Sequence, residues 1–254
     1  MKAWNLKNKK AVITGGTKGI GAATATEFLS LGAAVVIVAR NEEEVNSTVS
    51  NWNKEGFEAY GVAADTSTIE GRIKLFNTVK EKWDAIDVLV NNVGTNIRKQ
   101  FNDYTTAEYQ QVFNVNIYST IEVTKMFFSL LQKPGNASII NVASIAGMLD
   151  AETGIPYGMT KAAEIQLTRG LANEWARHGI RVNTVSPWFT RTPLTEPLFD
   201  NPGLMEKVIR RTPLNRAADA DEMANVISFL AMDKSSYITG QNIVVDGGMT
   251  VKAF

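Results

Sequence analysis

Seven short apolar runs alternate with longer stretches of helical periodicity along this chain of 254 residues. The runs are rich in Ala, Val and Ile, and they lie at 11–14, 34–39, 58–64, 87–92, 138–143, 181–187 and 242–247. Strands that are apolar on both faces and are each followed by a helix are typical of βαβ units in a parallel sheet. Because right-handed crossovers place helices on both sides of such a sheet, the pattern predicts a doubly wound α/β fold of about seven strands.

No linker interrupts this alternation, and the length suits one large core, so we expect residues 1–254 to form a single domain. Asn41, Thr105 and Asp219 are each followed three residues later by Glu, and we expect them to be helix N-caps. The segment of about 188–218 is the least regular, since it holds four of the seven prolines. An irregular insertion late in an α/β fold is typical of a lid over a substrate site.

The composition excludes several classes of function. Lys plus Arg and Asp plus Glu each number 26, so there is no basic excess for nucleic acid or an anionic membrane. The chain has no cysteine, and its single histidine, His178, precedes Gly179 as at a helix end, so we expect no metal site. The first residues lack the apolar segment of a signal peptide, and a cytoplasmic location is expected.

The stretch TGGTKGIG at 14–21 places four glycines within seven residues, directly after the first apolar run. It lacks the Gly-Lys-Ser/Thr of a P-loop, because Ala22 follows Gly21, which disfavours a P-loop phosphotransferase. It also fails the G-x-G-x-x-G dinucleotide pattern. Glycines still let a backbone approach phosphate closely, and a helix from about Ile20 would point its free N–H groups at it. The loop therefore predicts a pyrophosphate site.

The end of the second run indicates which dinucleotide binds. An acidic residue at this position accepts the ribose 2′-hydroxyl of NAD, whereas an arginine suits the 2′-phosphate of NADP. This run ends in Arg40, and Lys18 of the glycine loop is expected near the same ribose. Two converging cations favour an anion between them, so the sequence predicts NADP(H).

A second pair of residues indicates acid–base chemistry. Tyr157 and Lys161 are four apart, so they share one face of a helix, and they follow a run that ends at Ser144. Free tyrosine titrates at about pH 10, and a cation held beside it favours the phenolate form. The Y-x-x-x-K spacing is weak evidence alone and gains weight from the cofactor loop upstream.

In combination, these stretches resemble the short-chain dehydrogenase/reductase family over nearly the whole chain. TGGTKGIG fits its T-G-x-x-x-G-x-G, NNVG at 91–94 fits its NNAG, and NVNI places Asn116 at the catalytic asparagine. SPWFTRTPL at 186–194 stands at its P-G-x-x-x-T, with Trp188 in place of the usual glycine. GTNIRK and LANEWARHGIRVN are similar to tropinone reductase-like members.

The resemblance implies a Rossmann-type NADP-binding catalytic domain that transfers a hydride between nicotinamide and the carbon of a carbonyl or alcohol. The substrate expected from the apolar pocket residues is a small or medium, largely apolar ketone or secondary alcohol. The implied catalytic residues are Asn116, Ser144, Tyr157 and Lys161. The expected cofactor-binding residues are Thr14, Gly15, Thr17, Lys18, Gly19, Ile20, Gly21, Arg40, Asp65, Thr66, Asn92, Val93, Gly94, Tyr157, Lys161, Pro187, Trp188, Thr190 and Thr192. The expected substrate-binding residues are Ile97, Ser144, Leu149, Ile155, Tyr157 and Trp188.

The resemblance also implies roles and partners. Tyr157 would donate the proton, Ser144 would orient the substrate oxygen, and Lys161 would hold the cofactor ribose. Asn116 would hold a water linked to Lys161. A homotetramer, or a homodimer, is expected through two long helices at about 106–132 and 156–178. The alternative is a non-catalytic NADP-binding sensor or structural subunit, which would have no use for this complete catalytic set.

Overall fold

A computed structural model describes residues 3–252, which contain a seven-stranded parallel sheet with the order β3-β2-β1-β4-β5-β6-β7. The predicted doubly wound α/β fold is confirmed, and each apolar run forms one strand. The strands are β1 Lys10–Thr14, β2 Ala34–Ala39, β3 Ala59–Ala63, β4 Val88–Asn91, β5 Ser138–Val142, β6 Arg181–Pro187 and β7 Asn242–Val245. The central strands are fully buried because helices cover both faces.

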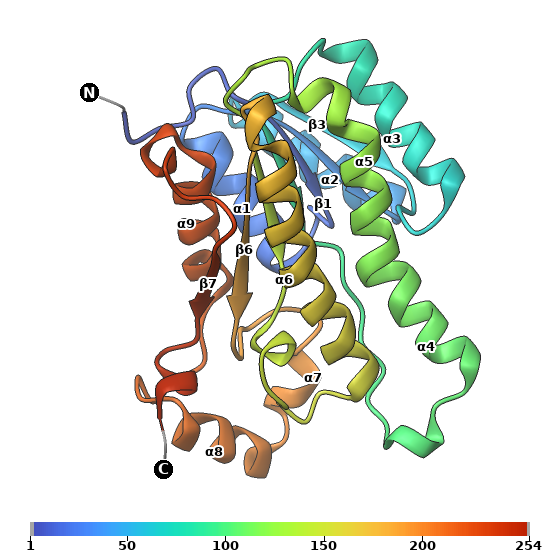
Figure 1. The fold of residues 1–254 in the computed structure, drawn as a ribbon, viewed down its shortest axis with the longest axis vertical. Helices are drawn as coiled ribbons and strands as arrows, with labels where there is room; N and C mark the ends of the chain where they lie inside the picture. The colour runs from blue at the N-terminus through green and yellow to red at the C-terminus, as the bar shows by residue number, and fades with distance from the viewer. Residues whose placement is uncertain (1–2, 253–254) are drawn as a thin grey trace.

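One face of the sheet packs against α1 (Gly19–Ser30), α2 (Glu42–Lys54) and α9 (Ala220–Ala231). The opposite face packs against α3 (Ile69–Lys82), α5 (Ser119–Leu131) and α6 (Ile155–Trp175). The core therefore has two apolar layers, one on each side of the sheet. Figure 1 shows α7 (Glu196–Phe199) and α8 (Pro202–Arg211) beyond the arrowheads of β6 and β7, at the carboxyl edge of the sheet.

The long helix expected at about 106–132 is interrupted. It consists of α4 (Thr106–Phe113), a π-helical turn at Asn114–Tyr118, and α5. A π-helical turn inserts one extra residue into the helix and changes which side chains face inward. Here the inserted turn contains Asn116, whose side chain is completely buried.

The strand order reverses between β1 and β4, because β2 and β3 extend on one side of β1 and β4 to β7 on the other. In open α/β sheets, ligands bind in the crevice that this reversal opens at the carboxyl ends of the strands. The glycine loop follows β1 and the NNVG stretch follows β4, so both border this crevice.

Candidate active site

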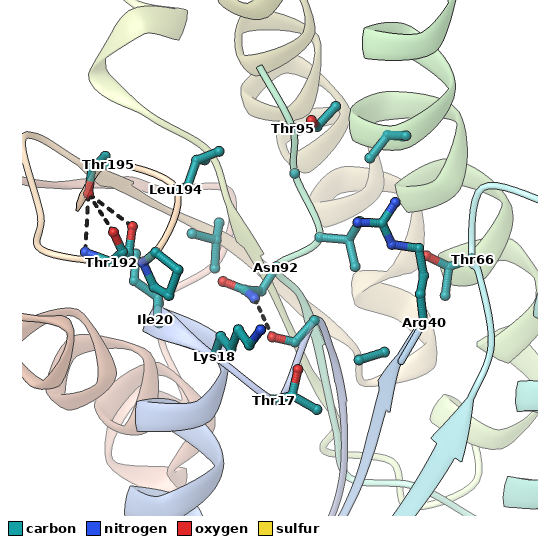
Figure 2. A pocket seen from close by; sticks show the side chains of 18 of the residues that line it. Thr17, Lys18, Ile20, Arg40, Thr66, Asn92, Thr95, Thr192, Leu194 and Thr195 are labelled. Atoms are coloured by element: carbon teal, nitrogen blue, oxygen red, sulfur yellow. Dashed lines mark hydrogen bonds between the residues drawn. The ribbon is translucent and has the colours of Figure 1, made fainter. Parts of the chain in front are cut away.

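A cavity of about 810 Å³ lies at this crevice. All the predicted cofactor-binding residues line it except Thr14 and Gly21. Figure 2 shows Arg40 and Thr66 at one end, Thr192 and Leu194 at the other, and Lys18 between them. The six loops that follow β1 to β6 all contribute to its wall, so residues far apart in the sequence meet around one space.

The glycines of the loop bring backbone to this wall, between the side chains of Thr17, Lys18 and Ile20. Gly15 has a φ of +67°, which is strained for residues with a β-carbon. A β-carbon at Gly21 would lie 2.1 Å from the carbonyl oxygen of Gly15, so α1 packs directly on the loop. Although Gly21 does not line the cavity, it fixes the loop's shape.

The amino end of α1 fits an anionic ligand. Its N-cap, Lys18, makes no side-chain capping bond, and the first turn carries no acidic residue. The N–H groups of this turn and the positive end of the helix dipole are therefore left for a ligand. Such a cradle suits the pyrophosphate of a dinucleotide, which the residues Gly15 to Ile20 would hold.

Asn92 ties the two sides of the crevice together. Its backbone N–H donates to Thr14 Oγ1 at 2.9 Å, and its side-chain amide donates to the carbonyl oxygens of Thr14 and Gly15 at 3.1 and 3.2 Å. Thr14 is buried and does not line the cavity. Its contribution is to hold the loop after β4 against the glycine loop.

Of the two predicted cations, Arg40 lies at one end of the cavity and Lys18 lies between the two ends. Arg40 is exposed, and no ion pair to it occurs within residues 3–252. Lys18 instead pairs with Glu44, with 2.6 Å between Nζ and Oε1. The sequence suggested only a helix-start role for Glu44, so this partner of Lys18 was not foreseen. Asp65 is fixed by hydrogen bonds from the backbone and hydroxyl of Ser67.

Ser144, Tyr157 and Lys161 line one wall of the cavity near the loop after β4. Ser144 Oγ accepts a hydrogen bond from Ala146 N at 3.1 Å, which leaves its hydroxyl proton to donate. Lys161 Nζ lies 5.8 Å from the centre of the Tyr157 ring. The expected phenol and ammonium groups are therefore neighbours, and the expected hydroxyl lines the same cavity.

Asn116 does not line the cavity but connects elements behind it. Its Oδ1 accepts from Thr95 N at 2.8 Å, and its Nδ2 donates to Thr95 O and to Thr160 Oγ1, both at 3.0 Å. Thr160 Oγ1 in turn donates to Tyr157 O at 2.8 Å. Asn116 thus positions the loop after β4 relative to the helix that carries Tyr157.

One buried neighbour of this site was not predicted. Glu164 lies one helical turn beyond Lys161, and its two carboxylate oxygens are 3.1 and 3.0 Å from Lys161 Nζ. Val142 O accepts from the same ammonium at 2.9 Å. The sequence did hold a signal for this pair, because an acidic residue three positions after a lysine lies on the same helix face.

The predicted substrate residues divide into two groups. Ser144, Tyr157 and Trp188 line the cavity, whereas Ile97, Leu149 and Ile155 do not. Ile97 and Leu149 lie on two loops, and Ile155 is the first residue of α6. The two loops are joined where Asn96 Nδ2 donates to Thr153 O at 2.8 Å.

Trp188 begins the segment predicted as a lid. Its backbone N–H donates to Val245 O at 3.1 Å, and its indole N–H donates to Thr212 Oγ1 at 3.0 Å. The two ends of this segment are held together, because Thr190 pairs with Ala218 as an isolated parallel bridge. The large ring is therefore anchored beside the cavity.

Comparisons with known proteins agree with this arrangement. A family model described as enoyl-(acyl carrier protein) reductase matches residues 15–250. A tropinone reductase homolog of Arabidopsis thaliana is 40% identical over 254 residues, which cover 100% of this chain and 96% of that protein. The structure of a gluconate 5-dehydrogenase from Burkholderia cenocepacia in complex with NADP and tartrate matches with a TM-score of 0.94, 31% identity and 98% coverage of both chains. L-Sorbose reductase from Gluconobacter frateurii, complexed with NADPH and L-sorbose, matches with a TM-score of 0.91, 28% identity, and 98% and 99% coverage.

A glycine loop at the reversal of strand order defines a dinucleotide-binding fold of the doubly wound class. The matches extend over almost every residue, and the chain belongs to the short-chain dehydrogenase/reductase family, close to its tropinone reductase-like members. The predicted family is confirmed, and with it the general class of oxidoreductases that use nicotinamide cofactors.

Two further observations concern membranes and metals. No helix within residues 3–252 combines the length and apolar character needed to cross a bilayer. The same range holds no group of three or more His, Cys, Asp or Glu arranged for a metal ion. The cytoplasmic location remains a prediction.

Proposed function

We propose that this chain is an NADP(H)-dependent carbonyl reductase or alcohol dehydrogenase that acts on a small or medium, largely apolar ketone or secondary alcohol. The observation that carries the proposal is that the predicted catalytic residues and the predicted cofactor loop line the same cavity. Ser144, Tyr157 and Lys161 line the same cavity as the glycine loop, so groups for proton transfer lie beside the predicted cofactor cradle. A binding-only protein would need the cradle and not these three side chains.

Each side chain has a role that follows from its chemistry. The bound nicotinamide supplies the hydride during reduction and accepts it during oxidation. Tyr157 donates a proton to the substrate oxygen during reduction and removes it during oxidation. Ser144 donates a hydrogen bond to the same oxygen and stabilises its developing negative charge. Lys161 provides positive charge beside Tyr157 and would hold the ribose.

The cofactor proposal rests on two cations of the cavity wall, of which Arg40 lies at the end where the adenosine would bind. Arg40 is exposed on the cavity wall and can bind a phosphate with two parallel N–H groups. Lys18 lies on the same wall, although Glu44 already neutralises part of its charge. Arg40 would therefore be the main residue that recognises the 2′-phosphate. The gluconate 5-dehydrogenase and the L-sorbose reductase described above were solved with NADP and with NADPH, which supports the same choice.

The substrate would lie between Tyr157 and the segment 188–218, which we assign as the lid of a single catalytic domain spanning 1–254. Trp188 and Leu194 give this side of the cavity an apolar surface. A mainly apolar pocket with a few polar groups around the reacting oxygen suits a ketone of modest polarity.

A substrate screen tests the function. The purified chain is mixed with a panel of cyclic and aliphatic ketones and alcohols, with NADPH or NADP⁺ and in parallel with NADH or NAD⁺, and the reduced cofactor is followed by absorbance. We expect turnover of at least one ketone, faster with NADPH than with NADH. Binding of NADPH without turnover of any panel member would instead identify a sensor.

A further inference from the structure

Lys161 and Glu164 form the one ion pair in residues 3–252 whose two side chains are both almost fully buried, with 4% and 2% of their surfaces exposed. Each of the other ion pairs has at least one partner that is 18% or more exposed. Burying two charges is costly unless their geometry is close and their remaining bonds are made. Here both carboxylate oxygens reach the ammonium, and Val142 O accepts from it as well.

The two groups respond to burial in opposite ways. Burial alone lowers the pKa of Lys161, but attraction to Glu164 and to Tyr157 raises that pKa above its ordinary value. Burial raises the pKa of Glu164 to about 7, and the Lys161 ammonium opposes only part of this rise. The ammonium therefore depends on a carboxylate that itself titrates near neutral pH.

The described elements packed against α6 offer no second buried, unengaged charge that could replace Glu164. Helix α6 packs against α4, β5, β6, the π-helical turn and the 3₁₀ turns at 145–147 and 176–178. Of these, β5 and the 145–147 turn carry no titratable side chain. The remaining titratable side chains of these elements and of α6 are exposed or engaged elsewhere: Glu108 with Lys99, Arg181 with three backbone carbonyls, His178 against the Phe128 ring, and Tyr109, Tyr118, Arg169, Glu174 and Arg177 at the surface.

We propose that Glu164 is a positioning residue that acts through Lys161, whose ammonium it keeps charged and oriented beside Tyr157. The inference rests on the proposed function for the role of Lys161 in turnover. Without the carboxylate, the buried ammonium keeps Val142 O as a partner but loses its counter-charge. It then loses its proton at a lower pH, and the positive charge that assists Tyr157 disappears with it.

The titration of Lys161 tests this directly and requires no substrate. Protein labelled with ¹³C-lysine is titrated by NMR, and the Lys161 signal is assigned by its absence in Lys161→Met. We expect Glu164→Gln to lower the midpoint of Lys161 by at least about one pH unit, a tenfold change in its deprotonation constant. Glu164→Asp keeps the negative charge and should retain most of the wild-type midpoint. Glu174→Gln, the same substitution at an exposed site on α6, should leave it unchanged.

The rate of turnover provides the second readout. With the ketone found in the screen, the alkaline fall of kcat in Glu164→Gln should move to lower pH by the same interval as the Lys161 midpoint. A general loss of packing would lower kcat equally at every pH. If the midpoint moves and the profile of kcat does not, the pair is structural and the inference is wrong.

The wild-type protein gives a result that does not depend on any Glu164 variant folding. Although its side chain is almost fully buried, Lys161 should lose its proton at a pH no lower than exposed lysines do. A wild-type midpoint well below that of exposed lysines, or an unchanged midpoint in Glu164→Gln, overturns the inference. Neither result involves turnover, so a failure here is distinct from a failure of the proposed function, which the substrate screen reports.

Discussion

The phenol of Tyr157 is the group that the proposed reaction uses for proton transfer. Tyr157→Phe removes this hydroxyl and keeps the ring that packs at the cavity wall. We expect kcat to fall at least about 100-fold, because general acid–base groups typically contribute 10² to 10⁴ in rate. NADPH affinity should change little. Steady-state kinetics and a fluorescence titration with NADPH measure the two quantities, and a near-wild-type kcat would remove Tyr157 from the mechanism.

Arg40 is expected to determine the choice of cofactor. Arg40→Asp replaces a cation on the cavity wall with an anion, which would repel a 2′-phosphate and could accept a 2′-hydroxyl. We expect the Kd for NADPH to rise at least tenfold, about 1.4 kcal/mol, with NADH affinity reduced much less. Arg177→Asp, at an exposed position close to the amino end of β6, is the matched control. Equal weakening of both cofactors would mean that Arg40 does not contact the 2′-phosphate.

For single residues, the sequence predicts which ones form the site better than it predicts which side chains they pair with. The motifs identify Ser144, Tyr157 and Lys161, and the structure places all three at one cavity. The pairing of Lys18 with Glu44 joins the N-cap of α1 to the first turn of α2, and its existence depends on how β1 and β2 align. The Lys161–Glu164 pair lies within one helix, and its spacing made it predictable once the burial of that helix face was known.

Trp188 connects the first residues of the lid segment to its last helix. Trp188→Phe keeps an aromatic ring but removes the indole N–H that bonds Thr212 Oγ1. A typical hydrogen bond is worth about 1 kcal/mol, which corresponds to a Tm lower by about 2–4 °C in a domain of this size. We also expect KM for the ketone to rise more than kcat falls, since the segment would close less firmly.

Calorimetry and steady-state kinetics check both effects. Trp4→Phe is the control, because Trp4 is 65% exposed and stacks on Phe229, away from the cavity. An unchanged KM for the ketone in Trp188→Phe would mean that the contact with Thr212 does not control access to the site.

Local signals predicted where helices begin but missed a change within one of them. Asn41 accepts from Glu44 N, and Thr105 and Asp219 form capping boxes as expected. The π-helical turn around Asn116 was not predicted. Nothing in its residues, NVNIY, distinguishes a π-helical turn from a continuous helix, and the turn is bonded to Thr95 and Thr160, which belong to other elements. A tertiary contact of this kind has no local sequence signature.

At the scale of the whole molecule, the alternation of apolar runs predicted the number of strands and the covering of both faces. It carries no information on strand order, which depends on where each crossover returns. The reversal between β1 and β4 is therefore a result of the structure. It explains why residues from six loops reach one cavity.

The homotetramer expected from the family resemblance remains a prediction. Helices α4 to α6 expose Tyr109, Tyr118 and Met159, an apolar set that a second copy could cover. Light scattering should give four times the chain mass of 27.8 kDa. Tyr118→Asp should lower this mass, whereas Ile69→Asp on α3 should not. A mass of one chain at micromolar concentration would contradict the prediction.

The bridge between Thr190 and Ala218 has an evolutionary consequence. Because the segment leaves and rejoins the body of the protein at adjacent points, its length and composition can vary without displacing a strand. Tyr157, Lys161 and the glycine loop lie outside it. Under the proposed function, exchange of residues 196–217 between relatives is thus a route by which a lineage can acquire new substrates while keeping Tyr157, Lys161 and the glycine loop.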